Sequence, residues 1–114
     1  MKKILSIVLA LAVSTPVQAA GNVLLGRSKA NRCAACHGDE GIGVHRRFPD
    51  LAGQDEAYLI EQLKAFRNDT RIDPLGLCNP IAKTLSDEDI EDLAAYYSSF
   101  PASGDLKERL KRGK

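Results

Sequence analysis

The sequence is poor in several residue types that particular classes of protein require. It has no tryptophan, one methionine, three tyrosines and three phenylalanines among 114 residues. Lysine and arginine number 16 against 15 acidic residues, so the chain lacks the positive excess typical of nucleic-acid-binding proteins. It is also too short for a two-domain enzyme. These properties predict one small domain with few bulky side chains to fill its core.

The longest apolar run lies at the N-terminus. Lys2 and Lys3 precede an apolar stretch from Ile4 to Val13, and Val17-Gln18-Ala19 has the small residues of a cleavage site. A membrane span needs about 20 apolar residues, so this run is too short. We therefore expect residues 1–19 to be a signal peptide, cleaved on export to the periplasm, and expect no stable membrane insertion. An uncleaved signal that acts as an anchor is the alternative.

Charge divides the remainder into a body and a tail. Residues 20–104 carry 9 basic and 13 acidic side chains, whereas residues 105–114 carry 5 basic and 2 acidic ones. We expect the body to be one domain that repels polyanions, so nucleic acid is not an expected partner. In the tail, Leu106 and Leu110 stand among basic residues, which predicts a weakly amphipathic, solvated segment. Docking of the tail to an acidic partner or a membrane surface is the alternative.

The body shows helical periodicity and no strand-like alternation, which predicts an all-α fold of about four helices. Two irregular segments, residues 38–53 and 70–79, are long loops of the kind that usually carry function. The expected helices are one capped by Asn22 that runs toward Cys33, one over residues 54–68, a short one opened by Asn79 and Pro80 that runs through Leu85, and one capped by Ser86 that ends before Pro101.

The chemistry is concentrated in Cys33-Ala34-Ala35-Cys36-His37. This C-x-x-C-H spacing is typical of covalent haem attachment, because cysteines three residues apart reach both vinyl groups and the next histidine lies beneath the iron. A thioredoxin-like disulfide needs a βαβ pattern, which the sequence lacks. A zinc site formed with Cys78 needs the adjacent Cys36 and His37 on one tetrahedron, which is awkward. Haem is therefore favoured over both alternatives.

The C-x-x-C-H motif and two longer segments of the chain resemble the small class I bacterial monohaem cytochromes c. The resemblance implies the class I cytochrome c fold around one covalent haem c, held by Cys33 and Cys36, with His37 as an axial ligand. It also implies that the Pro49 carbonyl accepts a hydrogen bond from His37, which fixes the imidazole tautomer. The three segments follow the family's order and read CAACHG (33–38), FPDLAGQDEAYLIEQLKAFRND (48–69) and IAKTLSDEDIEDLAAYYSSF (81–100).

Gly26 interrupts the first expected helix. Glycine inside a helix costs about 1 kcal/mol relative to alanine, so we expect a close neighbour that requires it. The resemblance implies that the first helix crosses the last one at Gly26, against Tyr96 and Tyr97.

The sequence departs from this family at the distal ligand. Aligned on residues 79–83, the position of the family's methionine holds Cys78, and the chain's only methionine is Met1. We interpret Cys78 as the second iron ligand, while a buried free thiol and a disulfide stay open. A thiolate adds negative charge at the iron, which favours the ferric state and lowers the reduction potential.

Other polar residues have weaker assignments. His45 lies eight residues after His37 and is expected to be a solvated loop histidine. The candidates for contact with the haem propionates, whose carboxylate geometry suits arginine, are Arg46, Arg47, Gln54, Arg67 and Arg71.

Three function classes follow. The first is a periplasmic electron carrier of low potential with His37 and Cys78 as axial ligands, which meets a redox partner protein or a second cytochrome subunit in a dimer. The second is a haem-based gas or redox sensor in which Cys78 dissociates. The third is a haem subunit of a sulfur- or nitrogen-redox enzyme complex. The sequence offers no acid–base constellation of its own, so we expect a carrier or subunit rather than an enzyme.

Overall fold

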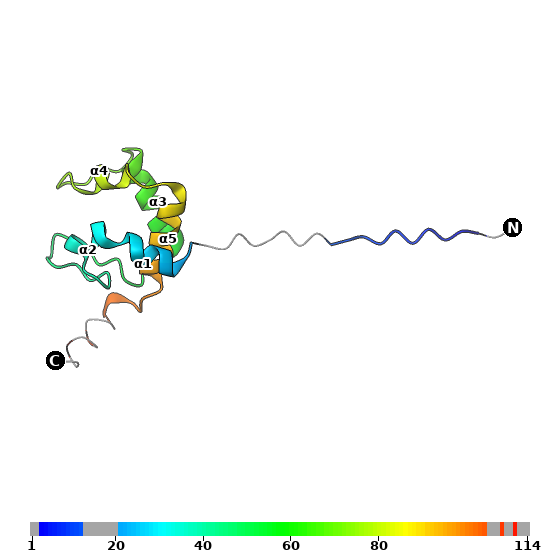
Figure 1. Cartoon of the computed structure of the whole chain (residues 1–114), viewed down its shortest axis with the longest axis horizontal. Coiled ribbons are helices and arrows are strands. Elements are labelled where there is room, and N and C mark those ends of the chain that lie inside the picture. Colours follow the sequence, from blue (N-terminus) through cyan, green and yellow to red (C-terminus); the bar gives the residue numbers. More distant parts are fainter. Residues whose placement is uncertain (1–2, 13–20, 105–107, 109–110, 112–114) are drawn as a thin grey trace.

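The computed structural model describes residues 3–12, 21–104, 108 and 111, and it is helical (Figure 1). Within these residues there is no strand, which confirms the all-α expectation, and no helix is long and apolar enough to cross a membrane. The expected cleavage site and both tail leucines lie outside the described residues. The helices are α1 (Val23–Lys29), α2 (Asn31–His37), α3 (Glu56–Arg67), α4 (Cys78–Ala82) and α5 (Asp87–Ser98).

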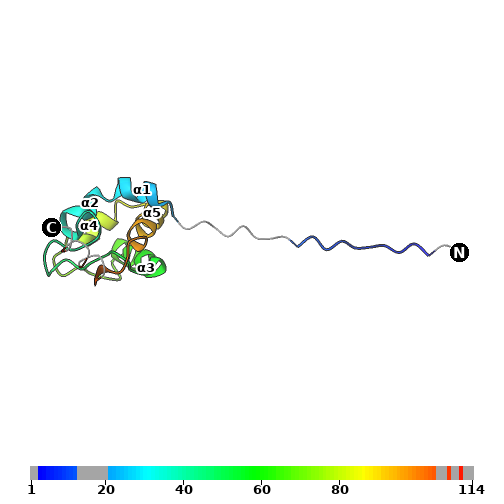
Figure 2. The same cartoon turned by 90° about the horizontal axis from the view of Figure 1, so that it is seen from below.

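The last helix, α5, forms the centre of the core. The apolar face of this helix is buried: the side chain of Ile90 is 0% exposed and that of Leu93 is 1% exposed. Ser86 begins the helix with a capping box, since its hydroxyl accepts the Asp89 N–H at 3.0 Å and the Asp89 carboxylate accepts the Ser86 N–H at 3.0 Å. Helix α1 crosses α5 on one side and α3 packs on another (Figure 2). The expected helix and its cap are therefore confirmed.

Gly26 marks the point where α1 touches α5. A Cβ at this position would lie 2.0 Å from the Asp92 carbonyl oxygen and 2.6 Å from the Tyr96 Cβ. The close neighbour that the sequence required is thus present, and it is the backbone of α5 together with Tyr96. Tyr97 is not among the nearest atoms. The absence of a side chain lets the two helices approach closely enough to bury their contact face.

We expect Gly26→Ala to destabilise the protein. The added methyl group would meet a carbonyl on a rigid helix rather than a flexible side chain, and such overpacking costs about 1–3 kcal/mol, more than the roughly 1 kcal/mol of helix propensity gained. Thermal unfolding followed by circular dichroism measures the effect. Leu24→Ala on the exposed face of the same helix is the matched control, and equal melting temperatures for the two variants would contradict this account.

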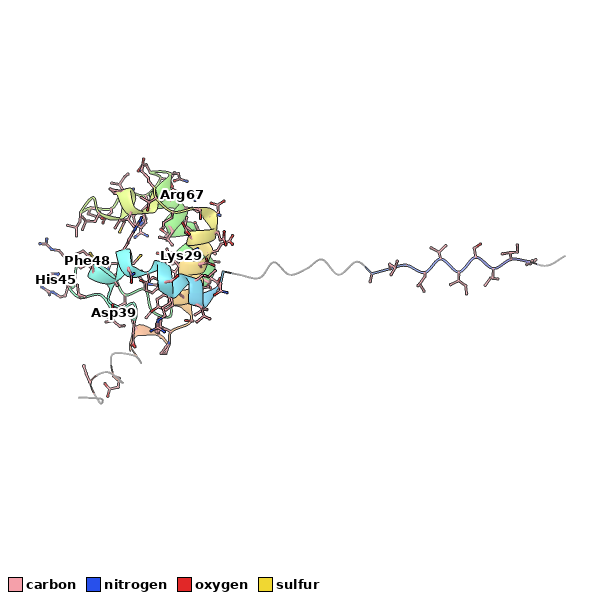
Figure 3. The ribbon with its side chains drawn as sticks, in the orientation of Figure 1. Lys29, Asp39, His45, Phe48 and Arg67 are labelled. Atoms are coloured by element: carbon pink, nitrogen blue, oxygen red, sulfur yellow. The ribbon has the colours of Figure 1, made fainter. Side chains whose placement is uncertain are left out.

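A buried carboxylate on α5 forms hydrogen bonds and an ion pair across the contact between α1 and α5. Asp92 is 3% exposed, and it accepts the Asn22 N–H at 2.7 Å and the Lys29 Nζ at 2.6 Å. Lys29 also pairs with Asp89 at 2.9 Å. The Lys29 ammonium holds the pKa of Asp92 below its usual range and lowers the pKa of Asp89 to about 2. Figure 3 shows Lys29 where α1 crosses α5.

These lowered pKa values predict acid sensitivity. A carboxyl group with a lower pKa in the folded state stabilises the fold above its unfolded pKa of about 4 and loses that contribution as the pH falls. We therefore expect stability to decrease between about pH 4 and pH 2, the window set by the pKa of Asp89. Denaturant unfolding at a series of pH values measures this. Lys29→Met should flatten the profile, and an identical profile in that variant would show that the acid sensitivity arises elsewhere.

Two expected helices have different bounds. The first one divides at Ala30 into α1 and α2; Ala30 is a turn residue whose N–H donates to the Arg27 carbonyl, three residues back, at 3.3 Å. The short helix ends at Ala82 rather than Leu85. It also begins at Cys78, so Asn79 is not its cap. The Asn79 side chain turns instead into the preceding loop, where it finds buried hydrogen-bond partners.

Candidate cofactor site

A cavity of about 340 Å³ lies at the end of the molecule where Figures 1 and 2 place α2 and α4. The segment 47–51 contributes to its rim, so the first long loop does enclose a site. Its lining is largely apolar and comes from every helix except α1. The apolar lining residues are Phe48, Leu51, Leu59, Leu63, Phe66, Leu77, Ile81, Ala82, Leu85, Leu93, Ala94 and Tyr97.

Helix α2 presents the three residues of the motif to this cavity. Cys33 and Cys36 stand three residues apart on one helix face, and His37 follows at the end of α2. Both cysteines are free thiols. Burial raises the pKa of Cys33 above its usual range, which is the opposite of the environment of a reactive, nucleophilic cysteine. What suits the pair for attachment is their placement, since both thiols line the cavity from one face of α2.

A hydrogen bond to the backbone orients the imidazole of His37. Its Nδ1 lies 2.7 Å from the Pro49 carbonyl oxygen, the contact that the resemblance implied. Since a carbonyl can only accept, Nδ1 carries the proton, and in the neutral imidazole Nε2 then has the free lone pair. Phe48 packs edge-on against the ring at 6.4 Å. This arrangement is that of a histidine prepared to bind a metal through Nε2.

Cys78 lines the same cavity from the first residue of α4. It is half-buried, and burial together with the Asp73 carboxylate raises the pKa of Cys78 to about 11. The Asp73 carboxylate also accepts the Cys78 N–H at 3.1 Å. The sulfur therefore lies on a different wall from the residues of α2, in a segment fixed by hydrogen bonds.

The residues present fit a flat, apolar macrocycle with a metal at its centre. The cavity offers two thiols on one wall, an imidazole with a free Nε2, and a further sulfur from a second element. The Tyr97 hydroxyl is buried there beside the Cys33 thiol, and burial raises the pKa of Tyr97 well above its usual range. A largely apolar wall with a few soft donors is typical of a cofactor pocket.

The zinc alternative does not match this geometry. Among the residues that the structure describes, no three side chains of His, Cys, Asp or Glu are grouped closely enough to hold a metal ion. The four residues Cys33, Cys36, His37 and Cys78 are therefore not arranged as one tetrahedral site. These four residues line one cavity, but they do not converge on a single metal ion.

The candidates for the propionates separate into two groups. Arg47, Gln54 and Arg71 line the cavity, whereas Arg46 does not. Arg67 is engaged elsewhere, since its guanidinium contacts Asp87 at 2.5 Å and the Leu85 carbonyl at 3.2 Å (Figure 3). The same figure places His45 at the outer part of the loop, and this histidine is exposed, as expected.

Sequence reasoning missed several polar residues that line this cavity, among them Arg32 and Asp73. Arg32 precedes the first cysteine and lines the cavity, although its guanidinium also donates to the Thr84 hydroxyl at 2.6 Å. Asp73, read from the sequence only as part of a turn, accepts hydrogen bonds from the backbone of the Cys78 loop. The pair Asp73-Pro74 indicated the turn, but no sequence signal showed which backbone groups the carboxylate would face.

Comparison with known proteins identifies the family of this chain. The family model for Cytochrome c matches residues 26–100. The chain is 46% identical over 81 residues to cytochrome c-554(548) of Halomonas halodenitrificans, a match that covers 70% of this chain and 98% of that protein. The chain belongs to the cytochrome c family. Its cofactor is covalently attached haem c, and it is an electron-transfer cytochrome.

Two further relatives are longer than this chain. The crystal structure of reduced recombinant cytochrome c4 from Pseudomonas stutzeri superposes with a TM-score of 0.62 at 38% identity, over 72% of this chain and 47% of that one. The thiosulfate dehydrogenase electron acceptor of Stutzerimonas stutzeri is 46% identical over 68 residues, which are 59% of this chain and 32% of that protein. The chain thus spans about half, or less, of these two relatives, and the class I cytochrome fold is confirmed.

Proposed function

We propose that this cytochrome is a low-potential electron carrier of the periplasm, with haem bound through Cys33 and Cys36 and with His37 and Cys78 as iron ligands. The observation that carries the proposal is that Cys78 lines the haem cavity; the resemblance to the class I cytochromes implies that this is the position of their methionine ligand. The only methionine of the chain is Met1, at the far end of the sequence. The residues that the structure describes include no methionine, so none of them offers a thioether to the cavity.

Each residue has a definite role in this proposal. The bound haem supplies a one-electron ferric/ferrous couple. The Pro49 carbonyl holds the His37 ring in one orientation and makes its Nε2 a better donor. The apolar walls from α3 and α5 keep water away, which strengthens every charge interaction inside. The Cys78 thiol, whose pKa is raised to about 11 without the cofactor, would lose its proton on binding ferric iron, and the resulting thiolate would add a negative charge that favours the oxidised state and lowers the potential.

A place in sulfur metabolism is a second candidate. It is favoured by the 46% identity to a protein named a thiosulfate dehydrogenase electron acceptor. In that case this cytochrome takes electrons from a redox enzyme, and its partner is that enzyme or a second cytochrome subunit. The present residues supply the electron-carrying site alone, so this candidate specifies the partner and leaves the chemistry of the site unchanged.

A potentiometric titration of the purified haem protein tests the carrier function. We expect a reversible one-electron transition well below that of cytochromes with methionine and histidine ligands. The reduced protein should remain six-coordinate and bind carbon monoxide slowly. Rapid, stoichiometric uptake of carbon monoxide would favour the sensor, and a potential in the methionine/histidine range would contradict the ligand assignment.

A further inference from the structure

The loop before Cys78 is organised by a buried amide. Asn79 is 8% exposed, and its Nδ2 donates to the carbonyls of Phe66 at 3.0 Å and Arg71 at 2.8 Å. Its Oδ1 accepts the Asp73 N–H at 2.8 Å. One side chain thereby joins the end of α3, the middle of the loop and the start of α4.

The carboxylate of Asp73 closes the loop from the other side. Its Oδ2 accepts the N–H groups of Leu77 at 2.7 Å and Cys78 at 3.1 Å. Between them the chain turns at Gly76, whose φ of +68° lies in the left-handed region. The N–H of Gly76 donates to the Asp73 carbonyl at 2.9 Å. The backbone that carries Cys78 is therefore held at both ends of a closed turn.

Apolar packing contributes little to holding this loop. Ile72 is 65% exposed and Leu75 is 42% exposed, and neither lines the haem cavity. Since the free energy of burial scales with the apolar area removed from water, these side chains stabilise the closed loop only weakly. The hydrogen bonds of Asp73 and Asn79 are then the main barrier to opening, because several are partly buried and one partner is charged.

We propose that Asp73 and Asn79 are positioning residues whose hydrogen bonds to the loop limit how fast Cys78 leaves the haem iron. These hydrogen bonds are together called the clasp. The inference rests on the proposed role of Cys78 as a ligand. For another ligand to bind on that side, the loop must open and the clasp must break. The rate of exchange at the iron therefore reports the strength of the clasp, whereas the presence of thiolate on the iron reports only the ligand assignment.

Imidazole binding to the oxidised haem protein measures this exchange. We expect Asn79→Ala to bind imidazole about tenfold faster than the unmodified protein, because the buried contacts to three backbone groups and the 3.3 Å contact to the Asp69 carboxylate are lost. Asn68→Ala is the matched control, since among the described residues the side chain of this exposed asparagine bonds to Thr70 alone, and the rate should stay within about twofold. Gly26→Ala controls for general loss of stability, because its site lies at the α1–α5 crossing.

Two substitutions at Asp73 separate geometry from charge. Asp73→Asn retains an oxygen that accepts the Leu77 and Cys78 N–H groups, and should keep slow exchange while raising the potential, since a negative charge near the ligand is removed. Asp73→Ala should both accelerate exchange and raise the potential. If Asn79→Ala does not fold, amide hydrogen exchange decides in the unmodified protein: the N–H groups of Leu77 and Cys78 should exchange together through one opening.

The outcomes distinguish this inference from the proposed function. If the oxidised protein carries thiolate on the iron but Asn79→Ala and Asp73→Ala exchange at the unmodified rate, the clasp is refuted and Cys78 remains the ligand. Equal acceleration in Gly26→Ala would also refute it, because general instability would then explain the effect. If the oxidised protein has no thiolate on the iron, the ligand assignment itself fails.

Discussion

Cys78→Met is expected to raise the reduction potential by on the order of hundreds of millivolts, within the span that axial ligands set in haem proteins. A neutral thioether would replace an anionic thiolate, so the ferric state would lose the charge that favours it. Spectroelectrochemical titration of the purified variant and of the unmodified protein measures the shift. Absorption features typical of methionine and histidine ligation should appear in the variant.

The neighbouring residue provides a matched control for this experiment. Leu77 also lines the cavity, so Leu77→Met places a thioether one residue away and leaves Cys78 in place. We expect its potential to stay close to that of the unmodified protein. If Cys78→Met and Leu77→Met had the same potential as the unmodified protein, Cys78 would not be the ligand, and the free-thiol or disulfide interpretation would replace it.

Loss of both motif cysteines should abolish covalent attachment of the cofactor. In Cys33→Ser/Cys36→Ser no sulfur remains on α2 to form a thioether bond, so acid-acetone extraction should remove all colour from the protein. Each single variant should retain one bond and give weaker attachment. The measurement compares haem in the precipitate and in the extract, for protein made in a host that matures c-type cytochromes.

Cys78→Ser is the control for that extraction, because it removes a sulfur that we do not assign to attachment. Its haem should stay with the protein, as in the unmodified chain. Colour that survived extraction from the double variant would contradict the assignment of Cys33 and Cys36. A colourless, zinc-containing unmodified protein would overturn the haem site altogether.

Local patterns in the sequence were sufficient for the elements that repeat with helical spacing. The α5 helix was predicted with its cap because Ser86, an acidic first turn and a regular apolar stripe all lie within one segment. The α3 helix was predicted over 54–68 and observed over Glu56–Arg67, with Asp55 as its cap. Gly26 was correctly expected to need a close neighbour, since a glycine inside a helix has a cost that packing must offset.

Contacts between distant residues were beyond this reasoning. Lys29 and Asp92 are 63 residues apart in sequence, and each alone reads as an exposed surface charge. Asn79 before Pro80 has the form of a helix cap, yet its partners Phe66 and Arg71 are 13 and 8 residues away. The cap interpretation was wrong because the Asn79 Oδ1, the atom that would accept a helix N–H, instead accepts the Asp73 N–H at 2.8 Å, while Nδ2 donates to these two carbonyls.

In the candidate site, too, some residues could be predicted from local sequence patterns and others depend on how the chain folds. The C-x-x-C-H motif and the Pro49 position could be named in advance, because they follow from spacing and from resemblance to a family. The wall that Cys78 occupies depends on how α4 and its loop fold, which no local pattern specifies. Arg32 and Asp73 were missed for that reason, since only the folded chain brings them to the cavity.

The most direct measurement of the central claim is the low-temperature electron paramagnetic resonance spectrum of the oxidised, unmodified protein beside that of Cys78→Ala. If Cys78 is bound opposite His37, the unmodified protein gives the signals of low-spin ferric haem with a thiolate ligand, and Cys78→Ala lacks them. Signals without thiolate character in the unmodified protein, or identical spectra for the two proteins, would show that Cys78 does not bind the iron.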